Sequence, residues 1–296
     1  MFDVIILGGS YSGMAAALQL ARGRRSVLVV DAGVRRNRFA SASYGLLAQD
    51  GKAPEEIIRD AKAQLLEYPN VTWRAGTATH AERRDQDFVV SVDGSELCIG
   101  KRLILALGVR DDVPDIPGLK ERWGKSVFHC PYCHGYELNN GHLGVIATSE
   151  TSMHQALMIP DWGITTFFTN GVFEPDEEQR RQLAARNVSI EREKIADVSG
   201  QAIVTLHDGR MISLAGLFVG SKVQVSSPLA KQLGCEFEES PLGCVIKTDA
   251  LKETSIPNVF ACGDAARTAG NVTFALADGV LAGSAAHRSL MFEGVH

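Results

Sequence analysis

The first thirty residues alternate between apolar runs and turns. Residues 3–7 (DVIIL) form an apolar run after Asp3, which predicts a parallel strand that is buried on both faces. A glycine-rich turn over residues 8–13 and a helical pattern over residues 14–22 follow, and a second apolar run over residues 26–30 ends at Asp31. Strand, glycine-rich turn, helix, strand and acidic residue in this order are typical of a dinucleotide-binding unit.

The rest of the chain continues this alternation of strands and helices. The pattern predicts an amphipathic helix, a hairpin that leads into a buried strand, and a strand followed by a small-residue helix near the C-terminus, at residues 53–67, 87–99, 102–107, 258–261 and from 271 onward. Further apolar strands at residues 143–147 and 164–168 predict a second unit, and the linker-like string PDIPG at residues 114–118 precedes it. We therefore expect an α/β protein with two βαβ-like halves.

Composition excludes several classes of protein. The 296 residues, 45% hydrophobic and 22% charged, are enough for two ordinary domains with cores. A net charge of -5 without clustering argues against a nucleic-acid partner. No apolar run reaches the roughly 18–20 residues of a membrane span, and Asp3 stands where a signal peptide needs positive charge. Six cysteines do not make a disulfide framework in a chain this long, so we expect a reducing, cytoplasmic setting.

The glycine-rich turn has the chemistry to hold a pyrophosphate. Gly8 permits the tight turn, Gly13 lets the helix approach the strand, and the helix N-terminus offers free N–H groups and partial positive charge. Ser10 replaces the usual middle glycine, but it is small and its hydroxyl can donate to phosphate. Asp31 is expected to accept hydrogen bonds from an adenosine ribose and to disfavour a 2′-phosphate, so FAD or NAD is favoured over NADP. A chance glycine-rich turn is the alternative.

A second candidate binding motif lies near the C-terminus. Gly263 and Asp264 follow the strand at residues 258–261, where a carboxylate can accept hydrogen bonds from a polyol such as the ribityl chain of a flavin. A plain strand-end or helix-cap aspartate is the alternative. Because the two motifs stand at opposite ends of the sequence, we expect one site built from both ends with a second domain inserted between them.

Between these ends, residues 129–137 read HCPYCHGYE. The C-x-x-C spacing lets two thiols close a short disulfide and lowers the pKa of one of them, so we interpret Cys130 and Cys133 as a redox pair. His134, with an ordinary pKa near 6.5, is the predicted acid–base group, and His129 and Glu137 are candidates for orienting it. The alternatives are a zinc half-site, for which a matching second pair is missing, and inert thiols. We expect inert thiols at Cys98, Cys235, Cys244 and Cys262.

Together these motifs resemble the low-molecular-weight thioredoxin reductase family of FAD-dependent pyridine nucleotide-disulfide oxidoreductases over nearly the whole chain. The resemblance rests on the glycine turn with Asp31, the strand end at residues 105–108, the C-x-x-C pair and residues 260–264, in this order. It implies two Rossmann-like domains of the three-layer ββα, FAD/NAD(P)-binding type. The FAD-binding domain would be discontinuous (residues 1–113 and 244–296), and the central nucleotide-binding-like domain (residues 114–243) would hold the redox pair. A homodimer and a domain rotation are implied too, with Cys133 facing the flavin and Cys130 attacking the partner.

The string from Cys130 to Glu137 is most similar to a CPxCHG(Y/W)E subgroup that includes the dithiol oxidases of gliotoxin, holomycin and romidepsin. The chain departs from NADPH-dependent relatives in its central domain. After the strand at residues 143–147, the string TSETS lacks the glycines of a phosphate turn, and Glu150 adds negative charge there. No arginine follows directly after the strand at residues 164–168. NADPH is therefore a doubtful cofactor, unless it binds in an atypical pocket.

The residues expected to contact FAD lie in turns beside strand ends and helix starts. Residues 35–49 are interpreted as a loop over the cofactor, and a strand ending at Thr77 and Ala78 is expected to pass the adenine. The full set is Gly8, Gly9, Ser10, Tyr11, Ser12, Gly13, Asp31, Ala32, Gly33, Arg38, Gln49, Thr77, Ala78, Ala106, Leu107, Gly108, Gly263, Asp264 and the flavin-edge residues Asn271, Val272 and Thr273.

The sequence thus predicts an FAD-dependent thiol–disulfide oxidoreductase that uses Cys130, Cys133 and His134. Oxidation of a dithiol with oxygen or another electron acceptor is the favoured direction. A thioredoxin reductase-like enzyme with NADPH or another donor is the alternative, and a non-catalytic flavin-bearing redox sensor is the alternative of another class. The expected partner is a small dithiol or disulfide or a thioredoxin-like protein, with no metal, membrane or nucleic acid.

Overall fold

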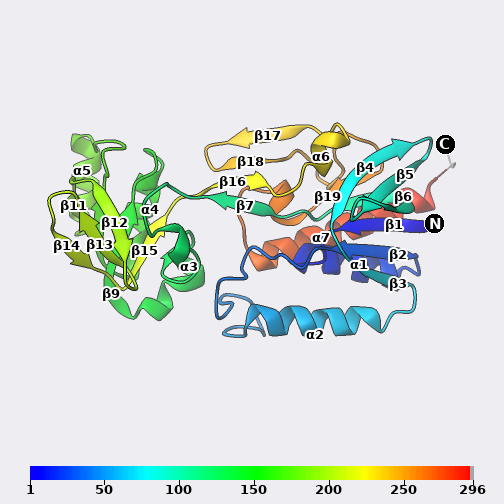
Figure 1. Cartoon of the computed structure of the whole chain (residues 1–296), viewed down its shortest axis with the longest axis horizontal. Coiled ribbons are helices and arrows are strands. Elements are labelled where there is room, and N and C mark those ends of the chain that lie inside the picture. Colours follow the sequence, from blue (N-terminus) through cyan, green and yellow to red (C-terminus); the bar gives the residue numbers. More distant parts are fainter. Residues whose placement is uncertain (294–296) are drawn as a thin grey trace. The chain divides into compact units, whose positions relative to one another are not determined.

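The computed structural model describes residues 1–293, which divide into two compact units. The first unit consists of Met1–Arg38, Pro54–Arg110 and the residues from Val223 onward, and the second consists of Phe39–Ala53 and Asp111–Lys222. Figure 1 colours the chain along its sequence, and its blue and orange segments lie in the same unit. Within residues 1–293, no helix is long and apolar enough to cross a bilayer.

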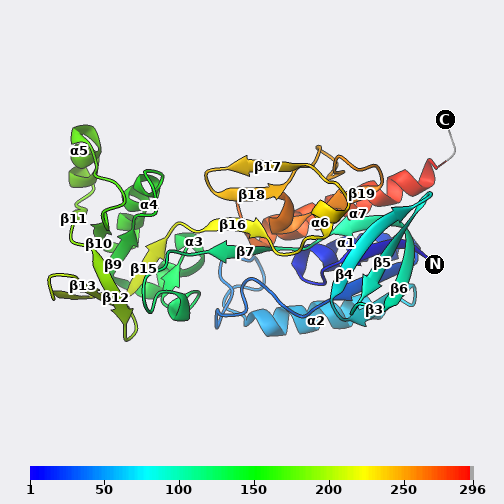
Figure 2. The same ribbon diagram turned by 45° about the horizontal axis from the view of Figure 1, so that its top comes forward.

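The main sheet of the first unit joins both ends of the chain. Its strands are β1 (Phe2–Leu7), β2 (Val27–Asp31), β3 (Val71–Ala75), β4 (Ala78–Arg84), β5 (Asp87–Val92), β6 (Glu96–Leu105) and β19 (Val259–Ala261). They follow the order β3-β2-β1-β6-β5-β4, and β19 pairs with β6. β1, β2, β3, β6 and β19 are parallel, whereas β5 and β6 form the predicted antiparallel hairpin of residues 87–99, and β4 pairs antiparallel with β5; the three strands are seen side by side in Figure 2.

The parallel strands of this sheet are buried on both faces. Ile5 and Leu7 of β1 belong to one hydrophobic core, whereas Val4 and Ile6 belong to the core on the other face. Neighbouring strands alternate in the same way, because successive side chains of a strand point to opposite faces. This explains why Val4–Leu7, the buried part of β1, is apolar without interruption instead of alternating with polar residues.

Two long helices of the first unit pack directly against each other. They are α1 (Tyr11–Arg22) and α7 (Val272–Met291), which Figure 1 shows together; α2 (Pro54–Leu66), α6 (Leu229–Gln232) and the 3-10 turn η4 (Gly263–Ala266) complete the unit. A Cβ atom placed on Gly279 would lie 2.1 Å from the backbone oxygen of Ser12, and one on Gly283 would lie 2.7 Å from that of Ala16. The glycines of α7 therefore allow a close contact between the two backbones.

A small sheet lies where the chain passes between the two units. It has the order β17-β18-β16-β7 and contains β7 (Val109–Asp112), β16 (Lys222–Val225), β17 (Phe237–Ser240) and β18 (Gly243–Ile246). The sequence placed the return to the first domain at residue 244, but in the structure residues from Val223 belong to the first unit. The physical reason is that β16 pairs with β18, a long-range contact that short strands do not reveal in sequence.

The second unit repeats the strand order of the first. Its parallel sheet runs β11-β10-β9-β15-β8, with β8 (Val127–Phe128), β9 (Asn140–Ile146), β10 (Gly163–Phe168), β11 (Ser189–Glu191) and β15 (Gly216–Val219). An antiparallel sheet is formed by β12 (Ile195–Ser199), β13 (Ile203–Leu206) and β14 (Met211–Ser213). The helices and 3-10 turns are α3 (Pro131–His134), α4 (Ser152–Met158), α5 (Glu177–Ala185), η1 (Lys120–Arg122), η2 (Tyr136–Leu138) and η3 (Ile159–Asp161). The predicted α/β class with two Rossmann-like halves is confirmed.

Candidate active site

Turns from distant parts of the sequence meet beside the end of β1. A Cβ atom on Gly8 would lie 2.1 Å from the backbone oxygen of Ala106, and one on Gly13 would lie 1.8 Å from that of Gly8. Gly263, which follows β19, would place its Cβ 2.5 Å from the hydroxyl of Ser12. These contacts exclude any side chain, so three segments of the chain pack closely together at this turn, as the glycine positions of a pyrophosphate-binding turn require.

Asp31 is held at the end of β2 by the same turn. The N–H of Gly9 donates to Oδ1 of Asp31 at 3.0 Å. A Cβ on Gly9 would lie 2.4 Å from the ring of Trp73, so this residue also has no room for a side chain. Among residues 1–293, no hydrogen bond reaches Oδ2 of Asp31, which leaves this oxygen available to a ribose hydroxyl. The following Gly33 has a φ of +73° and open space around it.

The predicted adenine-side residues lie between two strands instead of ending one. β3 ends at Ala75, Thr77 lies in the connection, and Ala78 begins β4. The N–H of Thr77 donates to Asp93 at 2.8 Å. The sequence had placed Thr77 and Ala78 at a strand end, and this is wrong because Gly76, with a φ of +156°, turns the chain one residue earlier.

The carboxyl ends of β6 and β19 and the start of α7 also belong to the first unit. Gly108, with a φ of +65°, has no atom within 4 Å of an added Cβ, so the chain after Ala106 and Leu107 borders open space. Asn271 caps α7, because its side chain accepts a hydrogen bond from the N–H of Thr273 at 2.7 Å. Val272 is the first residue of the helix. The predicted flavin-edge segment is therefore a capped helix N-terminus.

Arg36 is the residue of the basic run that reaches Asp264. Its guanidinium donates to Oδ2 of Asp264 at 2.9 Å, and both side chains are only 19% exposed. Arg38, which the sequence favoured, is exposed and donates to the backbone oxygen of Arg35. A run of charged residues in a loop has no periodicity that could distinguish these positions. Asn37 follows the same course and donates to the Tyr11 hydroxyl at 3.1 Å.

These residues of the first unit fit FAD. The cradle of Gly8, Gly13 and Gly263 suits a pyrophosphate, one oxygen of Asp31 suits a ribose, and Asp264 suits a polyol once its pairing with Arg36 is shared. Gln49, predicted as a contact, belongs to the second unit, and its Oε1 atom is buried without a hydrogen-bond partner among the described residues. The individual contact residues stay predictions.

A buried ion network around Asp278 of α7 has no counterpart among the sequence predictions. The side chain of Asp278 is 5% exposed and accepts two hydrogen bonds from Arg267, at 2.9 and 3.0 Å. It also forms an ion pair with Lys252 at 3.0 Å. Arg267 also lies over the ring of Phe274 at 4.7 Å. Because removal of one partner from a buried ion pair leaves an uncompensated charge, this network holds the turn after β19 against α7.

Cys130 and Cys133 lie side by side in the second unit. Their Sγ atoms are 2.7 Å apart, and both residues are half-buried. Cys130 precedes α3 in an extended conformation, and Pro131 opens the helix, a position where its fixed φ and missing N–H cost nothing. Cys133 then lies one turn later. The local sequence therefore brings the two sulfur atoms together as a redox pair needs.

His134 lies against the ring of Phe128, with the ring centroids 4.3 Å apart and the planes 20° from parallel. Burial lowers the pKa of His134 to about 4. The prediction of an ordinary pKa near 6.5 for His134 is wrong, because desolvation penalises the charged imidazolium. At neutral pH His134 is therefore uncharged, and it is ready to accept a proton from a thiol but not to donate one.

Gln155 of α4 connects the nucleotide-type helix to the redox motif. Its Nε2 donates to the backbone oxygen of His129 at 2.8 Å, and its Oε1 atom is buried without a partner among residues 1–293. His129 itself stacks with Trp123 at 6.1 Å between ring centroids. Glu137 lies in η2 and is exposed. These contacts therefore do not show either candidate, His129 or Glu137, orienting His134.

The turn after β9 uses its own backbone donors. The N–H of Thr148 donates to the hydroxyl of Ser152 at 2.9 Å, and Glu150 accepts from Gln179 of α5 at 3.1 Å. The sequence therefore folds into a closed polar turn, without the glycines that would let a phosphate approach.

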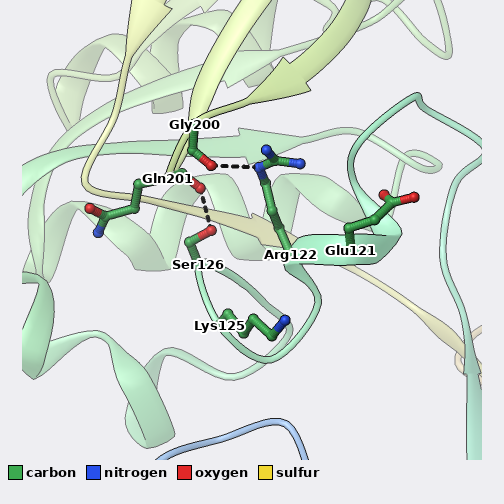
Figure 3. A pocket seen from close by; sticks show the side chains of 6 residues that line it. All are labelled: Glu121, Arg122, Lys125, Ser126, Gly200 and Gln201. Carbon is green, nitrogen blue, oxygen red and sulfur yellow. Dashed lines mark hydrogen bonds between the residues drawn. The ribbon is translucent and has the colours of Figure 1, made fainter.

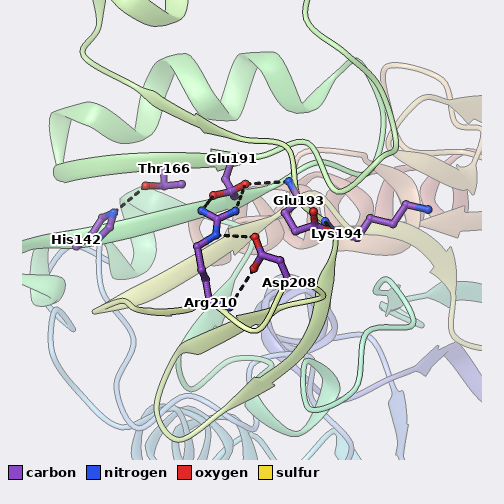
Figure 4. Close-up of polar contacts among 7 residues, drawn as sticks. All are labelled: His142, Thr166, Glu191, Glu193, Lys194, Asp208 and Arg210. Atoms are coloured by element: carbon purple, nitrogen blue, oxygen red, sulfur yellow. Dashed lines mark hydrogen bonds and ion pairs between the residues drawn. The ribbon is translucent and has the colours of Figure 1, made fainter.

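Two arginines of the second unit lie in the loops after β11 and β13, but carboxylates pair with them. Arg210 lies between Glu191 and Asp208, each at 2.6 Å (Figure 4), and Arg192 pairs with Glu174 at 2.8 Å. Asn170, after β10, accepts from the N–H of Ile195. In the sequence, we looked for arginines directly after β10. Arg192 and Arg210 stand more than twenty residues later in the chain, so a local pattern does not reveal that strand pairing brings them near the end of β10.

The other cysteines have no such arrangement. Burial raises the pKa of the Cys98 and Cys235 thiols, and it raises that of Cys262 to about 12. Among residues 1–293, no three His, Cys, Asp or Glu side chains form a group that could hold a metal ion. A cavity of about 400 Å³ beside Lys125 (Figure 3) is lined by Arg122 and Ser126, which donate to the backbone oxygens of Gly200 and Gln201. It contains none of the predicted site residues.

The fold and the redox pair define a pyridine nucleotide-disulphide oxidoreductase, and the model of that family matches residues 2–279 of this chain. The chain belongs to this family. It is similar to thioredoxin reductase sirT of Leptosphaeria maculans, 30% identical over 306 residues that cover 96% of this chain and 93% of the relative. Thioredoxin reductase tcpT of Claviceps purpurea is 31% identical, with coverage of 98% and 95%.

Solved structures show the same likeness. The oxidoreductase from Agrobacterium tumefaciens is 55% identical and superposes with a TM-score of 0.97, covering 98% of this chain and 99% of that one. HlmI is 33% identical with a TM-score of 0.92, and the coverage is 99% and 94%. The chain is therefore an FAD-dependent oxidoreductase of the thioredoxin reductase type that acts on sulfur groups, as the sequence predicted.

Asp264→Ala is expected to weaken FAD retention by roughly tenfold to a hundredfold, because a polyol loses a charged hydrogen-bond acceptor. Flavin absorbance per protein after dialysis measures this. Asp60→Ala, which removes a surface carboxylate of α2, is the control and should retain FAD like the wild type. Folded wild-type protein that is colourless and cannot be reconstituted with FAD would contradict the assignment of this site.

The two cysteines are expected to differ in the absorption spectrum. Cys130→Ser leaves a lone thiolate at Cys133, and a thiolate beside oxidised flavin gives a long-wavelength charge-transfer band. Cys133→Ser should show no band if Cys133 is the residue that faces the flavin. The opposite pair of spectra would reverse the roles of the two residues.

His134→Ala is expected to slow dithiol turnover by roughly 10²- to 10⁴-fold, the range for a general acid–base group. Because the His134 pKa is about 4, the imidazole stays neutral above this value. The ratio of wild-type to variant rates should therefore stay constant from pH 8 to 5 and fall towards one as the pH drops through about 4. Ionisation of the substrate thiols changes both rates by the same factor, so it does not affect their ratio. His154→Ala, an exposed histidine of α4, is the control. A loss under about threefold, or a ratio that falls near pH 6.5, would remove His134 from catalysis.

Proposed function

We propose that this enzyme oxidises a small dithiol to a disulfide through Cys130 and Cys133, with dioxygen or another acceptor as the final oxidant. The observation that supports this direction is the combination of a redox pair and a neutral histidine with a nucleotide-type turn that its own residues close. An oxidase takes its electrons from the substrate, so it needs no nicotinamide site.

The exchange begins with Cys130 and Cys133 as a disulfide. A substrate thiolate attacks Sγ of Cys130, a new sulfur–sulfur bond forms, and the Cys130–Cys133 bond breaks with its electron pair on Cys133. The second substrate thiolate then attacks the substrate sulfur of the mixed disulfide and releases Cys130 as a thiolate. The substrate leaves as a disulfide, having lost two electrons and two protons.

His134 supplies the base for this exchange. A neutral imidazole can take a proton from an incoming thiol, and only the resulting thiolate is nucleophilic. The low pKa keeps the base available throughout the physiological pH range. Its stacking on Phe128 fixes the plane of the ring, so the imidazole does not need to be ordered when a substrate arrives.

The first unit would hold FAD through the turn at Gly8 and Gly13, with Asp31 on a ribose and Asp264 on the polyol. Bound FAD would supply the two-electron acceptor for the enzyme dithiol, and dioxygen with two protons, giving hydrogen peroxide, would be the final oxidant. Arg36 supports this site by holding the carboxylate of Asp264 in place, and the N-terminus of α7 contributes a partial positive charge.

A thioredoxin reductase-like enzyme that uses NADPH is the second candidate. The names of sirT and tcpT support it, since both relatives are called thioredoxin reductases. Against it, Ser152 occupies the N–H of Thr148, and carboxylates already neutralise Arg192 and Arg210. A 2′-phosphate would have to displace the carboxylates from these arginines. Breaking the existing ion pairs costs free energy, because each displaced carboxylate loses its cation.

Three further properties complete the proposal. The enzyme is a homodimer located in the cytoplasm, as the family resemblance and the absence of a disulfide framework support. Its substrate is a small dithiol, with a thioredoxin-like protein as the alternative. A non-catalytic redox sensor is distinguished by steady turnover of a dithiol, which a sensor lacks and which mutation of either cysteine would abolish in an enzyme.

Anaerobic stopped-flow measurements are expected to show rapid bleaching of the flavin by dithiothreitol and very slow bleaching by NADPH or NADH at the same concentration. Hydride transfer needs a nicotinamide held by its phosphates, and the turn around Glu150 offers neither glycines nor free cations. The double variant Cys130→Ser/Cys133→Ser is the control and should lose bleaching by dithiothreitol. Rapid, saturable bleaching by NADPH would instead establish an NADPH-dependent reductase.

A further inference from the structure

Gln155 of α4 reaches the chain directly before the redox pair. Its Nε2 donates to the backbone oxygen of His129 at 2.8 Å, although the two residues lie 26 positions apart in the sequence. Met153 and Ala156 of the same helix are buried in a hydrophobic core of the second unit, so α4 is fixed independently of Gln155. The amide therefore tethers the peptide that leads into Cys130 to a helix that cannot easily move.

The tethered segment lies between a strand and a helix. The last paired residue of β8 is Phe128, and α3 begins at Pro131 with Cys130 as its N-cap. The carbonyl of His129 thus lies past the strand pairing and before the helix. A side chain of α4 supplies to this carbonyl the donor that a neighbouring strand or a helical turn supplies elsewhere in the sheet.

The position of Cys130 relative to Cys133 depends on this segment. Cys130 has an extended backbone (φ -115°, ψ 113°), whereas Cys133 lies within α3. Their Sγ atoms are 2.7 Å apart. Rotation of the peptide between His129 and Cys130 would move the first sulfur and leave the second in place. A hydrogen bond that holds the carbonyl of His129 therefore also holds the distance between the two sulfur atoms.

The second polar atom of the same amide indicates that this bond serves more than stability. Oε1 of Gln155 is buried and has no hydrogen-bond partner among residues 1–293. A buried acceptor without a partner costs free energy that an apolar side chain at this position avoids. Proteins break such local rules chiefly at functional sites, where a required geometry outweighs the loss of stability. Here the required geometry is that of the peptide before Cys130.

We propose that Gln155 is a positioning residue of the redox pair, which keeps Cys130 within bonding reach of Cys133 and so favours the disulfide form of the enzyme. The proposal rests on the exchange proposed above for the two cysteines. Gln155 takes no part in the exchange of bonds. Two thiols still become one sulfur–sulfur bond, and two electrons and two protons still leave to the oxidant. Only the equilibrium changes, because groups that are held together react as if at high concentration.

The test measures the equilibrium between dithiol and disulfide in the FAD-loaded enzyme, in anaerobic mixtures of reduced and oxidised glutathione. Oxidised glutathione is the two-electron oxidant, and thiol alkylation with mass spectrometry counts the two forms of the peptide that contains both cysteines. Gln155→Met keeps the length of the side chain but removes both polar atoms. Gln155→Ala is the second variant, since alanine suits a helix. Gln182→Met is the matched control, because Gln182 is an exposed glutamine of α5 whose Nε2 donates to Glu178.

The equilibrium constant for disulfide formation is expected to fall roughly tenfold in both Gln155 variants, the effect of one lost hydrogen bond, which corresponds to about 30 mV for a two-electron couple. Gln182→Met should have the wild-type constant. A merely structural role of Gln155 would lower the temperature of unfolding without changing this constant. An unchanged constant in both Gln155 variants would overturn the proposal, as would an equal fall in Gln182→Met.

A second measurement separates positioning from an electrostatic effect on the thiol. In the Cys133→Ser background, the alkylation rate of Cys130 should have the same pH profile with and without Gln155→Met, because one neutral side chain replaces another. A shifted profile that accounts for the whole change in the equilibrium would overturn the positioning role. If the pair responds to glutathione and to Gln155→Met as expected, but the wild type does not oxidise dithiothreitol, the proposed function fails and this inference stands.

Discussion

The close approach of backbone at the end of β1 is the constraint on which the first unit depends. Gly8, Gly13 and Gly263 meet Ala106 and Ser12 at distances that leave no room for any Cβ. A similarly close backbone contact occurs along α7, where Gly279 lies against the backbone of α1. Because these contacts join residues from both ends of the sequence, the site for FAD exists only when the discontinuous unit is assembled.

The second unit shows what happens when a similar strand order is used for another purpose. β9, the closed turn with Thr148 and α4 occupy the positions of a nucleotide site, yet Ser152 takes the backbone donor and paired carboxylates take the arginines. In the same unit, Gln155 of α4 donates a hydrogen bond to the backbone oxygen of His129, directly before Cys130. The fold is thus kept, while its polar groups serve the redox motif.

Desolvation sets the chemistry of the redox motif. The same burial that lowers the pKa of His134 to about 4 raises the pKa of inert thiols such as Cys262 to about 12. In both cases the neutral form is favoured, because a charge loses hydration inside the protein. For His134 this yields an imidazole that is neutral at physiological pH, although a weaker base, and for Cys262 it yields an unreactive thiol. Cys98 and Cys244 are as half-buried as Cys130 and Cys133, so what distinguishes the redox pair is the 2.7 Å distance between its two sulfur atoms.

By itself the sequence determined the order of elements, the glycine turn, Asp31 and the redox pair, because each depends on local spacing that a single segment contains. The hairpin before β6 and the small-residue helix α7 followed from periodicity in the same way. Tertiary structure alone decided that Arg36 and not Arg38 meets Asp264, that residues from Val223 join the first unit, that His134 is neutral, and that Gln155 donates to the backbone oxygen of His129. Pairing partners, burial and cavities arise from residues distant in the chain, and their energies depend on surroundings that no local pattern contains.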